Sequence, residues 1–273
     1  MLEFSIDRKK CRRCSLCMED CPVSIIEKDS EGFPFITEEK EKLCLKCQHC
    51  LAICPDAALS ILGKNPDESM PASDMPTAKQ VEVLIRNRRS IRHFKKNDVE
   101  FETIRSLLCV TANCPTGENM RALTFTIIDN REDMEKFVAK AYGLLEKRIE
   151  EGTLPERFRF YAALLRRYKS GRDIIFRGAP HLIVASAPKG EGTPEADCFI
   201  ALSYFDLYAY SLKVGTVWLG FLAFMFEFMP EIKDVLGIPA DHEAPYALLF
   251  GKAKYKYPRG VQRDDFRINR PEF

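Results

Sequence analysis

The residues best suited to chemistry are the cysteines, of which the chain of 273 residues has eleven. Eight of them lie between Cys11 and Cys54, in two runs that both read C-x2-C-x2-C-x3-C-P. Three thiolates from one short loop can converge on a cuboidal iron–sulfur cluster, which then takes its fourth ligand from farther away. Zinc also binds CxxC pairs, but it usually takes two separated pairs rather than a run of three plus one. The spacing therefore favours iron–sulfur clusters over structural zinc.

Both runs resemble the bacterial two-cluster ferredoxin pattern, in which the fourth cysteine of each run ligates the other cluster. The resemblance assigns one [4Fe–4S] cluster to Cys11, Cys14, Cys17 and Cys54, and the other to Cys21, Cys44, Cys47 and Cys50. His49 lies inside the second run, where the thiolate positions are filled, so we expect it at the surface. A ferredoxin-like domain is predicted for residues 1–62, because metal ligation supplies folding energy that so short a segment cannot gain by burial alone.

The overall composition is that of a globular protein, with 46% hydrophobic and 30% charged residues. The 41 Lys and Arg residues nearly cancel the 40 Asp and Glu residues, so no bulk attraction to nucleic acid or membranes is expected. The N-terminal residues lack the apolar segment of a signal peptide, and the longest apolar run, 214–226, is shorter than the about 20 residues of a membrane span. We therefore expect a cytoplasmic protein, in which cysteine clusters serve metal binding or catalysis rather than disulfides.

The rest of the chain has a different pattern. Residues 63–76 contain three prolines and small polar residues without periodicity, which predicts a linker before an α+β domain over 77–273. Residues 195–213 are apolar nearly all round, so a helix there needs cover on every side, and a subunit interface is the expected cover. Apolar runs predict strands and periodic charged segments predict helices: the strands are 123–128, 181–186, 216–219 and 246–250, and the helices are 131–150 and 156–170.

A second candidate site is the basic segment 86–96, which holds six Lys or Arg residues and Ser90. Guanidinium groups and a hydroxyl suit a phosphate dianion, because each charge-assisted hydrogen bond contributes about 1.5–3 kcal/mol. The same residues are also compatible with a solvated helix end or with a nucleic-acid-binding patch. The near-zero net charge argues against the patch.

Residues 88–94 (RRSIRHF) resemble the opening motif of the FMN-dependent nitroreductase family, Arg-(Arg/His)-Ser-x-(Arg/Lys)-x-Phe. The resemblance implies that Arg88 and Ser90 hold the FMN phosphate and that Arg92 reaches the N1/O2 side of the isoalloxazine, with Arg89 nearby. It also implies a mixed central sheet flanked by helices, and a homodimer with FMN at the subunit interface.

Three later segments resemble the same family in the same order. One resembles the family loop that reaches the flavin from the partner subunit, and contains Pro115, Thr116, Gly117 and Asn119. Another resembles the G-T-x-W-x-G segment, whose backbone amide donates to flavin N5, and contains Trp218, Leu219 and Gly220. Many relatives have a second glycine where this chain has Phe221, so the amide that contacts N5 stays open.

The third segment is the basic tail, residues 254–263, which resembles the family segment that closes over the FMN phosphate. We favour Arg263 for that contact, with Arg259 second. The three cysteines outside the two runs are expected to be buried thiols. Cys109 and Cys198 lie in helical stretches, and Cys114 adjoins the loop that is expected near the flavin, where an approach to substrate is the alternative.

Together the two resemblances imply a flavin oxidoreductase. Clusters carry one electron each, most organic reductions need two, and a flavin converts between the two regimes. We expect NAD(P)H or reduced ferredoxin to load the clusters, the clusters to reduce FMN, and FMN to reduce a small acceptor such as a nitroaromatic or a quinone. No side chain is required as a catalytic acid or base. Direct reduction of FMN by NAD(P)H stays open, as does an electron-transfer carrier that has no small-molecule substrate and serves a partner protein.

Overall fold

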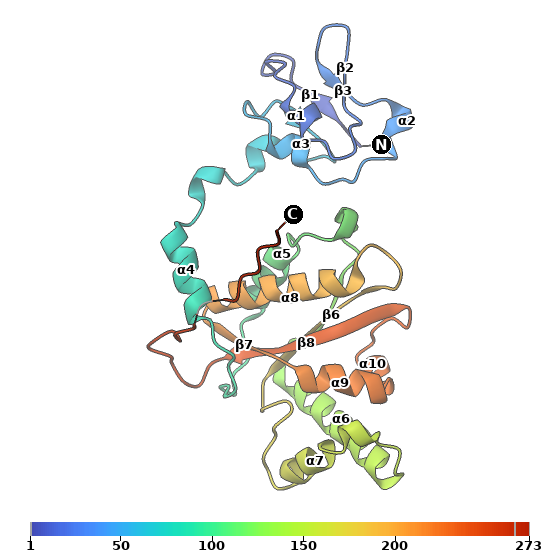
Figure 1. Ribbon diagram of the computed structural model, residues 1–273, viewed down its shortest axis with the longest axis vertical. Coiled ribbons are helices and arrows are strands. Elements are labelled where there is room, and N and C mark those ends of the chain that lie inside the picture. The colour runs from blue at the N-terminus through green and yellow to red at the C-terminus, as the bar shows by residue number, and fades with distance from the viewer. Residues whose placement is uncertain (1, 265, 273) are drawn as a thin grey trace. The chain divides into compact units, whose positions relative to one another are not determined.

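A computed structural model describes residues 2–264 and 266–272 of the chain (Figure 1). By its internal contacts the chain divides into two compact units. Unit 1 comprises Met1–Pro76 together with Glu118–Met120, and unit 2 comprises Thr77–Gly117 and Arg121–Phe273. None of the helices in the described residues is both long enough and apolar enough to cross a membrane.

Unit 1 has little regular structure. Two antiparallel pairs of short strands are formed by β1 (Ser5–Ile6) with β4 (Leu59–Ser60) and by β2 (Glu27–Lys28) with β3 (Pro34–Phe35). Its short helices are α1 (Leu16–Glu19), α2 (Glu38–Glu41) and α3 (His49–Ala52), followed by the 3-10 turns η1 (Pro66–Glu68) and η2 (Ala72–Asp74). The apolar core is correspondingly small and consists mainly of Leu2, Ile25, Ile26, Leu51, Leu59 and Ile61. Such a core fits the expectation that ligated metal supplies part of the folding energy.

Unit 2 is built on a four-stranded sheet in the order β5-β6-β8-β7. The strands are β5 (Thr124–Ile128), β6 (His181–Pro188), β7 (Val214–Trp218) and β8 (His242–Lys252), and all neighbours are antiparallel. Ser90 adds a parallel bridge to Thr216 on β7, which makes the sheet mixed as predicted. Hydrophobic residues follow one another without interruption at 182–185 of β6 and 247–250 of β8. Because successive side chains point to opposite faces of a sheet, both faces are apolar and need cover.

Helices cover both faces of this sheet (Figure 1). One core packs α5 (Phe101–Thr111) and α8 (Pro194–Ser211) against Ile183 and Leu248. The other core packs residues of α6 (Arg131–Glu150), α7 (Tyr161–Lys169), α9 (Gly220–Phe228) and α10 (Glu231–Val235) against Leu182 and Leu249. The remaining elements are α4 (Ala78–Asn87), η3 (Gly117–Asn119) and η4 (Glu156–Phe158).

Most predicted elements are present, but their bounds differ, and β8 is much longer than the predicted strand at 246–250. The strand predicted at 216–219 begins at Val214, and Leu219 already precedes α9. The helix predicted at 156–170 is interrupted, because a 3-10 turn after Pro155 is followed by α7 from Tyr161. Charge periodicity alone does not separate one continuous helix from a turn plus a helix. Helix α8 buries seven of its 18 residues within the chain itself, whereas Tyr204 is 45% exposed.

His181 makes the stability of unit 2 pH-dependent. Its ring is fully buried, Nε2 accepts the backbone N–H of Val99 at 2.9 Å, and burial lowers its pKa below 6.5 despite Asp98 nearby. The unfolded chain protonates this ring more readily than the folded one does. The contribution of His181 to the free energy of unfolding is therefore complete above pH about 6.5. It decreases as the pH falls below that value, by at most about 1.4 kcal/mol per pH unit. We expect the His181→Gln variant to lose this slope in urea unfolding followed by Trp218 fluorescence. His93→Gln, at an exposed histidine, should keep it, and an unchanged slope in His181→Gln would contradict the assignment.

Candidate functional site

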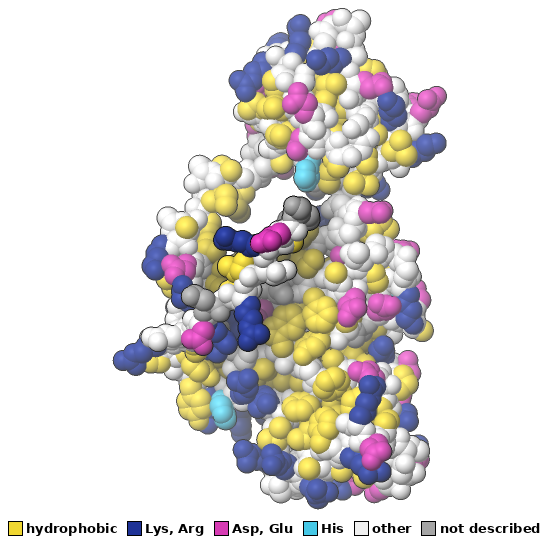
Figure 2. Space-filling view, viewed as in Figure 1, with side chains coloured by type: hydrophobic (Ala, Val, Ile, Leu, Met, Phe, Trp, Pro, Cys, Tyr) yellow, Lys and Arg dark blue, Asp and Glu magenta, His cyan; other side chains and the backbone are white. Residues whose placement is uncertain are grey.

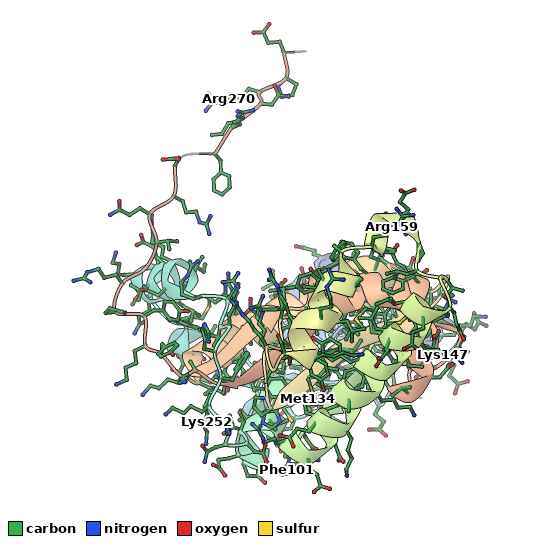
Figure 3. All side chains as sticks on the ribbon, turned by 90° about the horizontal axis from the view of Figure 1, so that it is seen from below. Phe101, Met134, Lys147, Arg159, Lys252 and Arg270 are labelled. Atoms are coloured by element: carbon green, nitrogen blue, oxygen red, sulfur yellow. The ribbon has the colours of Figure 1, made fainter. Side chains whose placement is uncertain are left out.

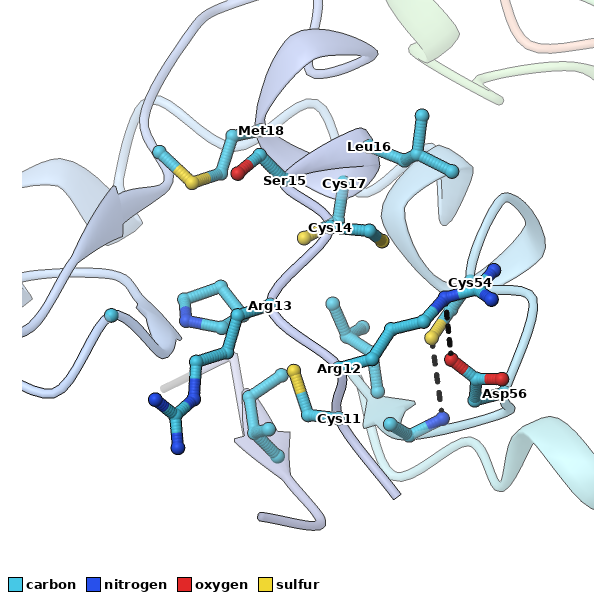
Figure 4. Close-up of a pocket in the computed structure, with 15 residues that line it drawn as sticks. Cys11, Arg12, Arg13, Cys14, Ser15, Leu16, Cys17, Met18, Cys54 and Asp56 are labelled. Carbon is cyan, nitrogen blue, oxygen red and sulfur yellow. Dashed lines mark hydrogen bonds and ion pairs between the residues drawn. The ribbon is translucent and has the colours of Figure 1, made fainter. Parts of the chain in front are cut away.

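The eight clustered cysteines line two separate hollows in unit 1. Cys11, Cys14, Cys17 and Cys54 share one hollow, where their side chains surround a common space (Figure 4). Cys21, Cys44, Cys47 and Cys50 share the other. Each hollow thus combines three thiols of one run with the fourth of the other run. This is the grouping that the ferredoxin resemblance implies, and it supports that ligand assignment.

The backbone of each run is curled in the same way. The residues on both sides of the middle cysteine have positive φ angles, 59° and 69° at Arg13 and Ser15, and 53° and 61° at Lys46 and Gln48. A left-handed conformation costs a non-glycine residue roughly 1–2 kcal/mol. Repetition of this cost at matching positions indicates that the loops are shaped to direct three thiols inward.

The thiols are partly buried before any metal is considered. Burial, followed by the charges of the neighbouring cysteines, raises the pKa of Cys17 to about 11, and burial raises the pKa of Cys50 to about 12. Metal ligation requires thiolates, so these sites bind metal with release of protons. Within the described residues no group of three or more His, Cys, Asp or Glu side chains is arranged around a single metal ion.

Charged side chains cover the rims of both hollows. His49 is at the surface, as predicted, and its Nδ1 lies 3.3 Å from Asp20. Arg12 Nε lies 3.1 Å from Asp56 beside the first hollow (Figure 4). Backbone amides also approach the sulfur atoms, since Ala58 N donates to Cys54 Sγ at 3.2 Å. Such amides stabilise ligated thiolates.

In unit 2 the basic segment is fixed to the edge strand β7. The backbone N–H of Ile91 donates to Thr216 O at 2.7 Å. Gly215 permits this approach, because a Cβ atom there would lie 2.5 Å from Ile91 Cγ1. The sequence thus brings residues 88–92 and the segment 215–220 together, as the resemblance implies.

Arg88 of this segment is half-buried and contacts a buried carboxylate. Its side chain is 26% exposed, and its Nη1 lies 3.3 Å from Oδ2 of the buried Asp206 on α8. Within the described residues this buried nitrogen donates no hydrogen bond, so the contact is an ion pair without hydrogen-bond geometry. A buried guanidinium nitrogen without an acceptor is costly, and an anionic ligand would satisfy it. Arg89 and Ser90 are half-buried beside it.

An open cleft lies next to this segment. It has an empty volume of about 640 Å³ and is lined by Arg92, Ile175, Arg177, Val217, Trp218, Leu219, Gly220, Phe221, Phe224 and Tyr246. The wall is aromatic, with the centroids of the Trp218 and Tyr246 rings 5.3 Å apart and their planes inclined at 61°. Figure 2 shows Lys and Arg side chains beside hydrophobic ones on one face of unit 2. A planar ring with an anionic tail suits such a wall.

Arg177 is a cleft residue that the sequence analysis missed. Burial, and then the charge of Arg92, lower the pKa of Arg177. The short segment that carries it is held by Asp173, which accepts the N–H groups of Phe176 and Gly178 at 2.9 and 3.1 Å. Arg177 itself has a φ of 58°. No motif surrounds it, so only the folded chain shows that it faces the same cleft as Arg92.

The predicted loop around Gly117 is anchored to α8. Gly117 N donates to Oδ1 of the buried Asp197 at 2.9 Å, and Thr116 Oγ1 accepts Arg121 N at 3.1 Å. Pro115 is exposed. Asn119 belongs to the part of the loop grouped with unit 1, where its Nδ2 donates to Leu45 O at 2.8 Å. The flavin contacts implied for this loop stay a prediction.

Residues 256–264 of the basic tail form no helix or strand, and Arg270 lies farther along the chain (Figure 3). Arg259 and Arg263 are both exposed. Between them the chain passes close to the end of α4, because a Cβ atom at Gly260 would lie 3.0 Å from Arg86 O. The tail therefore lies beside Arg86, which is two residues before Arg88 in the sequence. The contact of the tail with a phosphate stays a prediction.

The three remaining cysteines differ in exposure. Cys198 is fully buried, and burial raises its pKa to about 12. Cys114 is 8% exposed, and burial also raises its pKa, so both are inert core thiols as expected. The expectation for Cys109 is wrong, because its side chain is exposed. It lies on α5 away from the face that buries Ile104, Leu107 and Thr111.

Gly215 offers a test of the contact between β7 and the basic segment. Gly215→Ala would force the added methyl into Ile91, and we expect a loss of about 1–3 kcal/mol in the free energy of unfolding. Gly143→Ala is the matched control, because nothing lies within 4 Å of a Cβ atom added there, on helix α6. That change should stabilise the protein by about 0.5–1 kcal/mol. Urea unfolding followed by Trp218 fluorescence measures both, and equal stability of Gly215→Ala and wild type would refute the close contact.

Comparisons with known proteins match two separate parts of the chain. Residues 85–252 match the model of the nitroreductase family, and residues 10–59 match that of a 4Fe-4S dicluster domain. No curated protein is similar enough to match the chain.

Solved structures share the fold of unit 2. A nitroreductase with bound FMN from Bacteroides fragilis is 21% identical with a TM-score of 0.56, over 70% of this chain and 99% of that one. One with bound FMN from Desulfitobacterium hafniense is 23% identical with a TM-score of 0.55, over 71% and 100%. An FMN-dependent nitroreductase from Clostridium difficile is 17% identical with a TM-score of 0.53, over 71% and 100%.

The predicted cofactors agree with these matches, since FMN is present in nitroreductases of this fold and a dicluster domain holds two [4Fe–4S] clusters. The family match extends over more than half of the residues. This chain therefore belongs to the nitroreductase family and carries an N-terminal 4Fe–4S dicluster domain.

Proposed function

We propose that the protein is an FMN-dependent oxidoreductase whose two [4Fe–4S] clusters relay electrons to FMN for the reduction of a small organic acceptor. The observation that carries the proposal is the presence, in one chain, of two four-thiol hollows and an arginine-lined aromatic cleft. The acceptor class is a nitroaromatic, a quinone or a similar planar molecule. The donor is NAD(P)H or reduced ferredoxin.

The residues of unit 2 fit FMN in three respects. Arg88 presents a buried nitrogen that lacks a hydrogen-bond acceptor among the described residues. Arg92 and Arg177 place two like charges in one cleft, which an anionic ligand would stabilise. Trp218 and Tyr246 offer apolar ring surface to a planar group.

The proposed roles follow from these positions. When bound, FMN supplies the conversion between one-electron and two-electron transfer. Arg88 and Ser90 hold its phosphate, with Arg89, Arg259 and Arg263 in support, and Arg92 neutralises negative charge at the N1/O2 side. A backbone N–H near Gly220 orients N5, and the loop with Pro115, Thr116, Gly117 and Asn119 serves the flavin of the partner in a homodimer. Phe221 and Phe224 exclude water from the acceptor side.

Anaerobic reduction separates this function from its alternatives. With both cofactors bound, reduced ferredoxin or NAD(P)H should bleach the flavin absorbance, and added nitroaromatic or quinone should restore it with multiple turnovers. The Cys14→Ser/Cys21→Ser variant, which lacks one ligand of each cluster, should lose the ferredoxin-driven reaction. Bleaching by NAD(P)H that persists in this variant would identify direct reduction of FMN. Flavin that stays oxidised while the clusters are reduced would refute the relay, and reduction without small-molecule turnover would leave a carrier for a partner protein.

A further inference from the structure

Helix α8 carries two buried carboxylates, Asp197 and Asp206, which are 5% and 4% exposed. Asp206 has partners from two other segments. Its Oδ1 accepts the hydroxyl of Thr216, its Oδ2 accepts Trp218 Nε1 at 3.1 Å, and the same Oδ2 lies 3.3 Å from Arg88 Nη1. One carboxylate thus joins α8 to β7 and to the basic segment, and all three of its partners belong to the sequence motifs of the cleft and the phosphate site.

A buried carboxylate is costly unless it is paired and hydrogen-bonded. Leu202, one turn earlier on α8, packs in the apolar core with residues of α5 and of the sheet without that cost. The polar hub is therefore not required for the core alone. What an aspartate adds is a fixed direction for the Trp218 indole and a fixed position for the Arg88 guanidinium.

We propose that Asp206 is a positioning residue for FMN binding, which acts through Arg88 and Trp218. This inference rests on the phosphate contact proposed above for Arg88. Asp206 faces a single nitrogen of the guanidinium, and arginine has five N–H donors. The other donors stay available, so the carboxylate orients Arg88 without occupying it.

A contrary effect has to be weighed. The negative charge of Asp206 also lowers the attraction of Arg88 for a phosphate, so its removal would strengthen FMN binding if orientation did not matter. The ion pair lacks hydrogen-bond geometry, which makes it weak competition for a phosphate that accepts a charge-assisted hydrogen bond. We therefore expect the orienting effect of Asp206 on Arg88 to outweigh its charge effect. Removal of the carboxylate would weaken FMN binding through the first effect and strengthen it through the second.

The test is Asp206→Asn, which keeps the shape and one acceptor oxygen but removes the charge. We expect the dissociation constant for FMN to rise about tenfold, which corresponds to the loss of one oriented charge-assisted hydrogen bond between Arg88 and the phosphate. The flavin-free protein should also show altered emission of Trp218, which is the only tryptophan. Asp197→Asn is the matched control for emission, because it changes an equally buried aspartate of the same helix, which contacts Thr193 and Gly117 and not Trp218. Asp206→Glu, which keeps the charge, should bind FMN more tightly than Asp206→Asn and serves if the latter does not fold.

A double-mutant cycle with Arg88→Gln completes the experiment. If Asp206 acts through Arg88, the loss of FMN affinity in the double variant is smaller than the product of the single losses. Unchanged or tighter FMN binding in Asp206→Asn, or a cycle without coupling, would overturn the inference while the Arg88 contact stands. Unchanged FMN affinity in Arg88→Gln would instead refute the phosphate contact itself, and the positioning role with it.

Discussion

Replacing Cys14 and Cys54 together with serine should remove one iron–sulfur cluster, whereas replacing Cys14 and Cys21 together should remove both. The reason is the grouping of the thiols. Cys14 and Cys54 line the same hollow, while Cys21 lines the other one. If each run instead held its own cluster, Cys14 and Cys21 would share a cluster and the two double variants would exchange their behaviour. Iron and acid-labile sulfide per chain, measured after anaerobic purification, distinguish the two outcomes.

The size of the effect follows from how unit 1 is built. Its apolar core is small, so loss of a cluster removes folding energy as well as an electron site. We expect the Cys14→Ser/Cys21→Ser variant to lose the protection of unit 1 against proteolysis, while unit 2 keeps its fold. Cys109→Ser is the matched control, since this thiol is exposed and lies outside both hollows. Full iron content in both double variants would refute cysteine ligation by these residues.

The predictions from sequence succeed where the information is local. The spacing within each cysteine run fixes which thiols share a loop, and the apolar runs at 181–186 and 246–250 already identify β6 and β8. The family motifs single out Arg88 and Trp218 because each lies in a short string, and the structure brings both to Asp206, while their flavin contacts stay predictions. The prediction for Cys109 is wrong because α5 is amphipathic and Cys109 lies on its exposed face.

The residues that were missed depend on distant contacts. Asp206 lies in a helix that appeared apolar, and its importance comes from Arg88 and Trp218, which reach it from other elements. Tyr246 is one of two aromatic residues on β8, with Phe250, and only the strand order places it beside Trp218. Arg177 follows no motif and is positioned by Asp173. In each case the chemistry arises from tertiary structure, which spacing along the chain does not encode.

Arg177→Gln should change the stability of the flavin-free and the flavin-bound protein in opposite directions. Without flavin, Arg177 is partly desolvated and close to the like charge of Arg92, and both conditions lower its pKa and destabilise the fold. Neutralising it should therefore stabilise the flavin-free protein, by less than about 1 kcal/mol because the group is partly solvated. With FMN bound, the same change removes a cation from a cleft that holds an anion, and we expect roughly ten- to hundredfold weaker FMN binding.

Thermal unfolding with and without FMN, together with flavin fluorescence titration, measures both effects. Arg172→Gln is the matched control, because Arg172 is an exposed arginine near the same turn and does not line the cleft. It should leave both quantities unchanged. Arg92→Gln should likewise stabilise the flavin-free protein and weaken FMN binding, since removal of either charge abolishes the repulsion between the two arginines. If Arg177→Gln and Arg92→Gln instead lowered both the stability of the flavin-free protein and its affinity for FMN, the two arginines would support the fold. The cleft would then not be organised around an anionic ligand.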